Sequence, residues 1–138
     1  MNFPVGSYGY IAVNDLETAN DLLSLKRYNS PVVHTQQCIE KILKHYIKTT
    51  MKVCNDDESV MRSHKLVRLV KASGIPELLD RMGDIGMITD CYFDARYPGV
   101  DYTEYTADDA LRYFNLAVFV FDTVCKYLEK TPKRMELD

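Results

Sequence analysis

The sequence lacks a long apolar run: nothing in its 138 residues approaches the roughly 18 apolar positions that a membrane span needs. Its first residues, Met1-Asn2-Phe3-Pro4, place no basic region before an apolar stretch, so we expect no signal peptide. The four cysteines form no Cys-x-x-Cys pair, which argues against a zinc site and against a disulfide-rich secreted scaffold. We therefore expect a cytoplasmic protein with reduced cysteines and no membrane segment.

Several motifs of catalysis and cofactor binding are also missing. The sequence has neither a Gly-rich phosphate loop nor a Gly-x-Ser-x-Gly nucleophile turn. It contains no His-Glu-x-x-His pattern and no Glu-x-x-His pattern, and Glu40 and His45 are wrongly spaced to share one metal on one helix. We expect no metal site and no bound cofactor.

What is present is typical of a single globular domain. Hydrophobic residues make up 46% of the chain and charged residues 27%, which is enough to bury a core. No segment alternates as a strand does, and several repeat apolar residues at steps of three and four. We predict an all-α fold, an antiparallel up-and-down bundle of about five helices. One domain covers 1–138, with a core over about 12–130, a loosely ordered arm at the start and a tail over 131–138.

Capping residues and breakers set the expected helix bounds. The first helix begins at Asn14 or Asp15, after an arm without clear periodicity. A proline at the first position of a helix and a glycine just after its last position mark where the later helices are expected to begin and end. Gly83 and Gly86 weaken the fourth helix, so a kink or a close helix contact is expected there. The later helices are predicted over 30–52, 64–73, 77–94 and, after Thr103 or Thr106, up to about 130.

The net charge of −3 hides a basic middle, because lysine and arginine outnumber acidic residues between Lys26 and Lys71. Part of this charge follows the polar face of the helix predicted over 30–52. That face carries His34, Gln37, Lys41, Lys44, His45, Lys48 and Lys52. A solvated helix face is the commoner explanation. A phosphate ligand, or the acidic half of this chain or of a second copy, is the alternative.

The stretch from Cys91 to Tyr102 places an Arg96-Tyr97 pair at a bend between two helices, before Pro98-Gly99. A helix end with arginine near the last carbonyls explains such a pair most simply. Loop residues on a rigid scaffold also carry function, however. Basic and aromatic residues that meet in the bundle would bind phosphates or bases by charge and stacking.

Three motifs, in order, resemble the HEPN domain, the helical module named for higher eukaryotes and prokaryotes nucleotide binding. They are Gln36-Gln37-Cys38-Ile39-Glu40-Lys41, His64-Lys65-Leu66 and Ala95-Arg96-Tyr97-Pro98. The resemblance covers about 12–130. It implies a bundle of four to five helices, a homodimer and often a minimal nucleotidyltransferase partner in a toxin–antitoxin pair.

The resemblance also implies, for catalytic members, a metal-independent ribonuclease with an Arg-x(4–6)-His motif. Arg96 stands at the arginine position, but no histidine follows it before Thr103. We therefore expect a binding module for a nucleotide, RNA or a nucleotidyltransferase. Its expected ligand-binding residues are Gln37, Lys41, Lys44, His64, Tyr92, Arg96 and Tyr97. The alternatives are a ribonuclease that uses Arg96 with His64 as base, and a purely structural dimer.

Overall fold

The computed structural model describes residues 2–50 and 58–130, and every regular element within these ranges is a helix. The all-α prediction is confirmed. Three helices are long: α1 (Tyr8–Ser24), α2 (Asn29–Thr50) and α8 (Ala107–Lys130). Five are short: α3 (Glu58–Met61), α4 (Leu66–Ser73), α5 (Pro76–Leu79), α6 (Met82–Met87) and α7 (Cys91–Asp94). Among the described residues, no helix is both long and apolar enough to cross a membrane.

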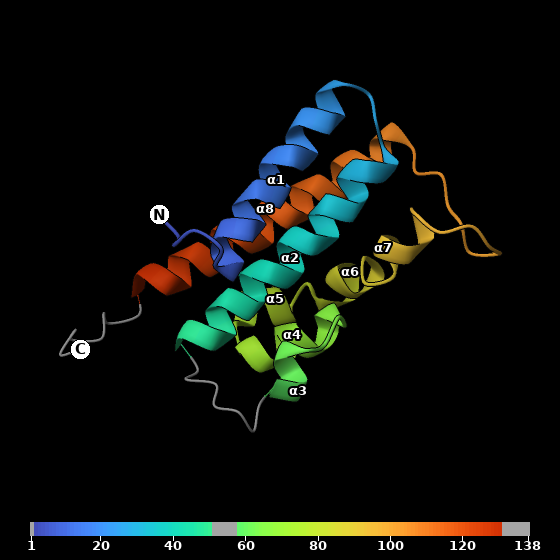
Figure 1. Ribbon diagram of the computed structural model, residues 1–138. Coiled ribbons are helices and arrows are strands. Elements are labelled where there is room, and N and C mark those ends of the chain that lie inside the picture. The colour runs from blue at the N-terminus through green and yellow to red at the C-terminus, as the bar shows by residue number, and fades with distance from the viewer. Residues whose placement is uncertain (1, 51–57, 131–138) are drawn as a thin grey trace.

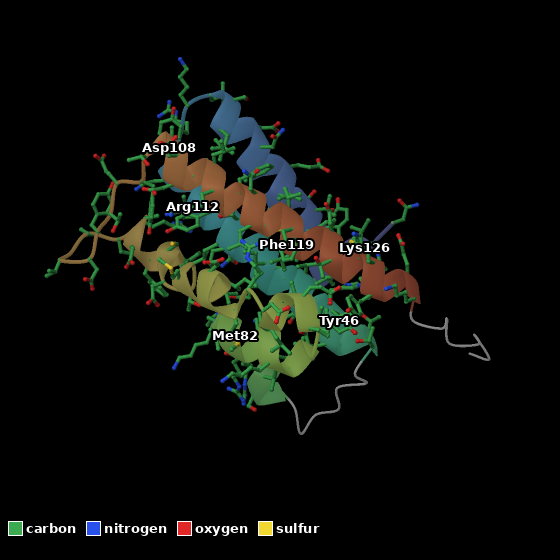
Figure 2. The ribbon with its side chains drawn as sticks, turned by 180° about the vertical axis from the view of Figure 1, so that it is seen from behind. Tyr46, Met82, Asp108, Arg112, Phe119 and Lys126 are labelled. Atoms are coloured by element: carbon green, nitrogen blue, oxygen red, sulfur yellow. The ribbon has the colours of Figure 1, made fainter. Side chains whose placement is uncertain are left out.

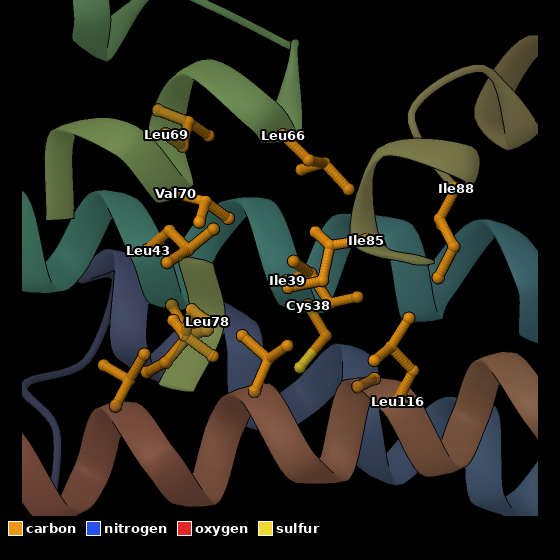
Figure 3. Packing of buried hydrophobic residues seen from close by; sticks show 14 of the residues in the cluster. Cys38, Ile39, Leu43, Leu66, Leu69, Val70, Leu78, Ile85, Ile88 and Leu116 are labelled. Atoms are coloured by element: carbon orange, nitrogen blue, oxygen red, sulfur yellow. The ribbon is translucent and has the colours of Figure 1, made fainter. Parts of the chain in front are cut away.

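The chain runs up through α1, down through α2, up again through the short helices and down through α8 (Figure 1). Helix α2 is the centre of this bundle and packs against α1, α8, α4 and α7. Its apolar residues Ile39 and Leu43 are fully buried between the short helices and α8 (Figure 3). Because α2 is covered on several sides, some of its polar residues are buried as well, among them Gln36, Glu40 and Lys44.

Helix α1 begins at Tyr8, so the predicted start at Asn14 or Asp15 is wrong. Gly6 adopts a positive φ of 82°, which turns the chain, and the Ser7 hydroxyl accepts a hydrogen bond from the Tyr10 amide at 3.2 Å. Serine is a preferred N-cap residue. The later part of the expected arm is therefore a capped helix start.

His45 of α2 fixes this first turn of α1. The Gly9 amide donates to His45 Nδ1 at 3.0 Å, which satisfies one of the N–H groups left unpaired at a helix start. The Phe3 ring meets the imidazole edge-on, with 4.8 Å between centroids. A Cβ at position 9 would overlap the Phe3 ring, so glycine is required there. Burial, with a smaller contribution from Lys48, holds the pKa of His45 below its ordinary range.

This contact predicts a loss of stability in mild acid. The unfolded chain takes up a proton on His45 below about pH 6.5, whereas the folded chain resists it because the imidazole is half-buried and its Nδ1 already accepts a hydrogen bond. Stability is therefore retained above that pH and falls below it. Urea unfolding at about pH 7.5 and about pH 5.5 measures the loss. His45→Asn, which keeps an acceptor without titrating, should lose less. An equal loss in both proteins would contradict the assignment.

The segment from Pro76 to Asp94 forms three short helices, and the single helix predicted over 77–94 is wrong. Gly86 allows α6 to lie close to α4, because a Cβ there would lie 2.8 Å from Val67 Cγ2. The expected close helix contact is thus confirmed. Proline does start α5, and Gly74 does end α4 with a positive φ of 66°. Helix α4 begins at Leu66 rather than at His64, so His64 lies in the connection before it.

The remaining bounds follow the sequence with one difference. Thr106 caps α8 as predicted, since its hydroxyl accepts from the Asp109 amide at 3.1 Å. In the apolar run of α8, residues 116, 117 and 120 are buried and residues 118, 119 and 121 are half-buried. Helix α3 lies in the connection between the helices predicted over 30–52 and 64–73, where no helix was predicted. The expected end of α2 at Lys52 lies outside the described residues.

Candidate functional site between α1, α2 and α7

A buried carboxylate holds the polar residues of α2 together. Glu40 is only 1% exposed, and its Oε2 accepts from Lys44 Nζ at 3.1 Å and from Lys41 Nζ at 3.2 Å. His64 Nδ1 lies 3.2 Å from the other oxygen, Oε1, which also accepts from the Gln36 amide at 3.3 Å. All four groups interact with one carboxylate, which we call the Glu40 cluster: Gln36, Glu40, Lys41, Lys44 and His64.

The Glu40 cluster places charge where the sequence predicted a solvated face. Lys44 is 4% exposed, so its assignment to that face is wrong. Burial by itself raises the pKa of Glu40, but the hydrogen bond from Lys44, the charge of Lys41 and the bond from His64 together hold that pKa below its ordinary range. The carboxylate is therefore ionised at neutral pH. An ionised partner is what makes a buried lysine ammonium tolerable.

A cleft of about 250 Å³ opens beside this cluster, and we call it the histidine cleft. The His64 side chain is 75% exposed, so its ring is anchored through Nδ1 while its other edge remains accessible. Phe93 is exposed at the same cleft, and its ring contacts those of Tyr92 and Tyr97. The lining residues are Gln36, Gln37, Glu40, His64, Thr89, Tyr92 and Phe93.

A larger cleft of about 490 Å³ adjoins it, and we call it the arginine cleft. Arg96 Nη1 donates to the Tyr92 hydroxyl at 3.2 Å, and its guanidinium carbon lies 5.1 Å from the Tyr92 ring centroid. The two clefts share Gln37 and Tyr92. The residues that line the arginine cleft are Asp15, Ser30, Val33, His34, Gln37, Tyr92, Ala95 and Arg96.

The arginine cleft contains a carboxylate–imidazole pair that sequence reasoning missed. Asp15 Oδ1 of α1 lies 2.8 Å from His34 Nδ1 of α2. Their side chains are 15% and 34% exposed, so the pair is partly shielded from water. The sequence interpretation of Asp15 was a helix cap, and His34 was one residue of a polar face. The predicted bundle places the first two helices antiparallel to each other. That pairing was the signal that could have brought Asp15 and His34 together.

Asn29 fixes the segment that carries Arg96. Its Nδ2 donates to the carbonyls of Ala95 at 3.1 Å and Thr103 at 2.8 Å, and its Oδ1 accepts from the Tyr105 amide at 2.8 Å. Three backbone groups on both sides of the Pro98-Gly99 turn are thus tied to the start of α2. The bend predicted there is present, and one side chain holds it in place.

A family model, the HEPN domain, matches residues 8–127, which is most of the chain. The chain belongs to the HEPN domain family. No curated protein and no solved structure matches it. The family is linked to nucleotide or RNA binding and to ribonuclease activity.

In this HEPN domain the predicted site residues do not share a single cleft. Gln37, Tyr92 and Arg96 line the arginine cleft, and Tyr97 stacks on Phe93 without lining either cleft. His64 lies in the histidine cleft, and Lys41 and Lys44 bind Glu40. His64 and Arg96 therefore line neighbouring clefts rather than one cleft. Within the described ranges, no three His, Cys, Asp or Glu residues are grouped as a metal site requires.

Proposed function

We propose that this HEPN domain binds the phosphate of a nucleotide or of single-stranded RNA in the arginine cleft, without catalysis of its own. The observation that carries the proposal is the Arg96 guanidinium against the Tyr92 ring inside a cleft of about 490 Å³. A guanidinium presents a planar fork of donors that matches phosphate oxygens. A cleft of this volume lies within the range of small-ligand sites.

The neighbouring charges and rings support the same ligand. His64 lines the histidine cleft and is 75% exposed, and Lys41, which binds the cleft residue Glu40, is 21% exposed. Exposed Phe93 and Tyr97 offer ring faces beside the shared Tyr92. Basic groups next to aromatic faces are what single-stranded nucleic-acid sites use, because charge holds the backbone and rings stack on bases. A phosphate at Arg96 would thus have room for a base nearby.

Arg96→Ala should weaken binding of a short fluorescent oligouridine by roughly 10- to 100-fold, because a charge-assisted contact is lost. Fluorescence anisotropy at fixed salt measures this change, and thermal melting verifies the fold. Arg112→Ala is a matched control: Arg112 stacks on Tyr113 at 5.1 Å and donates to Asp109, but it lies on α8 (Figure 2). Equal effects of the two variants would show that binding reflects net charge and not the cleft.

Two other outcomes would redirect the proposal. If oligouridine and mononucleotides fail to bind, but a minimal nucleotidyltransferase binds and Arg96→Ala abolishes this, the cleft is a docking site in a toxin–antitoxin-type pair. If the RNA is shortened in the presence of a chelator and Arg96→Ala stops the shortening, the domain is a metal-independent ribonuclease. Light scattering on the same samples tests the homodimer that the family resemblance implies.

A further inference from the structure

The arginine cleft offers a fixed hydrogen-bond acceptor as well as a cation. Asp15 accepts a hydrogen bond from His34 Nδ1 over 2.8 Å, so in the neutral imidazole the proton resides on Nδ1. Nε2 then carries a lone pair and is an acceptor. It is also the ring nitrogen that remains for a ligand, because His34 lines the cleft with Arg96.

An acceptor and a guanidinium in one cleft suit a particular kind of ligand. Arg96 supplies only donors and requires an anion, whereas His34 Nε2 requires a donor from the ligand. A ribonucleotide with a 3′-phosphate, as within RNA, carries both in adjacent positions, since its 2′-hydroxyl lies next to that phosphate. A deoxyribonucleotide carries the phosphate and lacks this donor. The 2′-hydroxyl is the group by which proteins distinguish RNA from DNA.

We propose that the arginine cleft selects ribonucleotides over deoxyribonucleotides, with His34 Nε2 accepting from the 2′-hydroxyl of the nucleotide whose phosphate Arg96 holds. This inference rests on the proposed function and names its ligand class. Asp15 is the positioning residue, because its carboxylate sets the tautomer and the orientation of His34. In this arrangement, residues of α1 and α2 recognise the sugar, while the segment after α7 binds the phosphate.

Gln37 is the competing acceptor and has to be separated from His34. Its Nε2 donates to Gln36 Oε1 at 2.5 Å, and Gln36 in turn donates to Glu40, so the Gln37 amide is also oriented. Its Oε1 could receive the same hydroxyl. Gln37→Leu removes that acceptor at similar volume and leaves the Asp15–His34 pair intact, which makes it the matched comparison for His34→Phe.

The experiment compares short oligouridine with the same sequence in deoxyuridine, by anisotropy at fixed salt. Wild type should bind the ribose probe roughly five- to tenfold more tightly than the deoxyribose probe, because one neutral hydrogen bond contributes about that much to affinity. His34→Phe should bind the two probes equally and keep the deoxy affinity, whereas Gln37→Leu should keep the preference. Asp15→Asn should reduce the preference, because an amide that donates to Nδ1 makes Nε2 a donor.

Each outcome is decisive. Equal binding of the two probes by wild type, or a preference that survives in His34→Phe and vanishes in Gln37→Leu, would overturn the inference while leaving phosphate binding intact. Failure of both probes to bind wild type would overturn the proposed function and the inference with it. Circular dichroism and melting of all variants confirm that the bundle is folded, and gel analysis confirms that the ribose probe is intact.

Discussion

Glu40→Ala should lower the free energy of unfolding by about 3–5 kcal/mol, because it leaves the Lys44 ammonium buried without its counter-charge. Lys44 is 4% exposed and lies 3.1 Å from Glu40, so its ammonium is shielded from water and depends on the carboxylate. The same change also removes the partner of His64 Nδ1. Urea unfolding at neutral pH, followed by circular dichroism, gives the change in free energy.

The opposite truncation provides the control. Lys44→Met should lower the free energy of unfolding less than Glu40→Ala does, because Glu40 keeps Lys41 and His64 while the methionine side chain fills the buried site.

The pH dependence of stability gives a second check. The folded pKa of Glu40 lies below its ordinary value of about 4.5, so its stabilisation is present above that pH and is lost as the pH falls through the folded pKa. Equal losses in both variants would contradict the asymmetry.

Asn29→Ala should lower the free energy of unfolding by about 2–3 kcal/mol and should also weaken ligand binding. The substitution removes two hydrogen bonds to carbonyls and one from an amide, and all three hold the segment that carries Arg96. Asn29→Asp should not rescue the protein, since a carboxylate cannot donate to the carbonyls of Ala95 and Thr103. Urea unfolding and oligouridine anisotropy measure the two effects.

A matched asparagine tests whether the effect belongs to this position. Asn115 is exposed on α8, so Asn115→Ala should change neither stability nor binding appreciably. If Asn29→Ala destabilises the bundle but leaves oligouridine binding unchanged, the bend does not position Arg96. If neither property changes, the three hydrogen bonds contribute little in solution.

Local sequence signals predicted the elements whose causes are local. The predicted helix start at Pro76, helix end at Gly74 and helix cap at Thr106 are all observed. Each of these residues acts through its own backbone or through the adjacent turn. The close approach of α6 to α4 depends on Gly86 meeting Val67 of another helix, which periodicity along one helix does not encode.

The site was predictable only where its residues share an element. Tyr92 and Arg96 are one turn apart in sequence, so their contact follows from local geometry. Lys41 and Lys44 share the same helix and the same polar pattern, yet Lys44 is buried and Lys41 is not, a difference that the pattern does not encode. The Asp15–His34 pair joins two helices, so its identity depends on their relative register.

The region between α2 and α8 consists of short helices, so the two sides of the arginine cleft differ in local stability. His34 and Gln37 belong to α2, a helix of 22 residues packed on several sides, whereas Arg96 follows α7, a helix of only four residues. Short helices with few buried contacts open at lower free energy than the core does, and amide hydrogen exchange reports such openings. A ligand that bridges Arg96 and α2 would reveal this difference in stability. It would slow amide hydrogen exchange in the α7 segment and leave exchange in α2 almost unchanged.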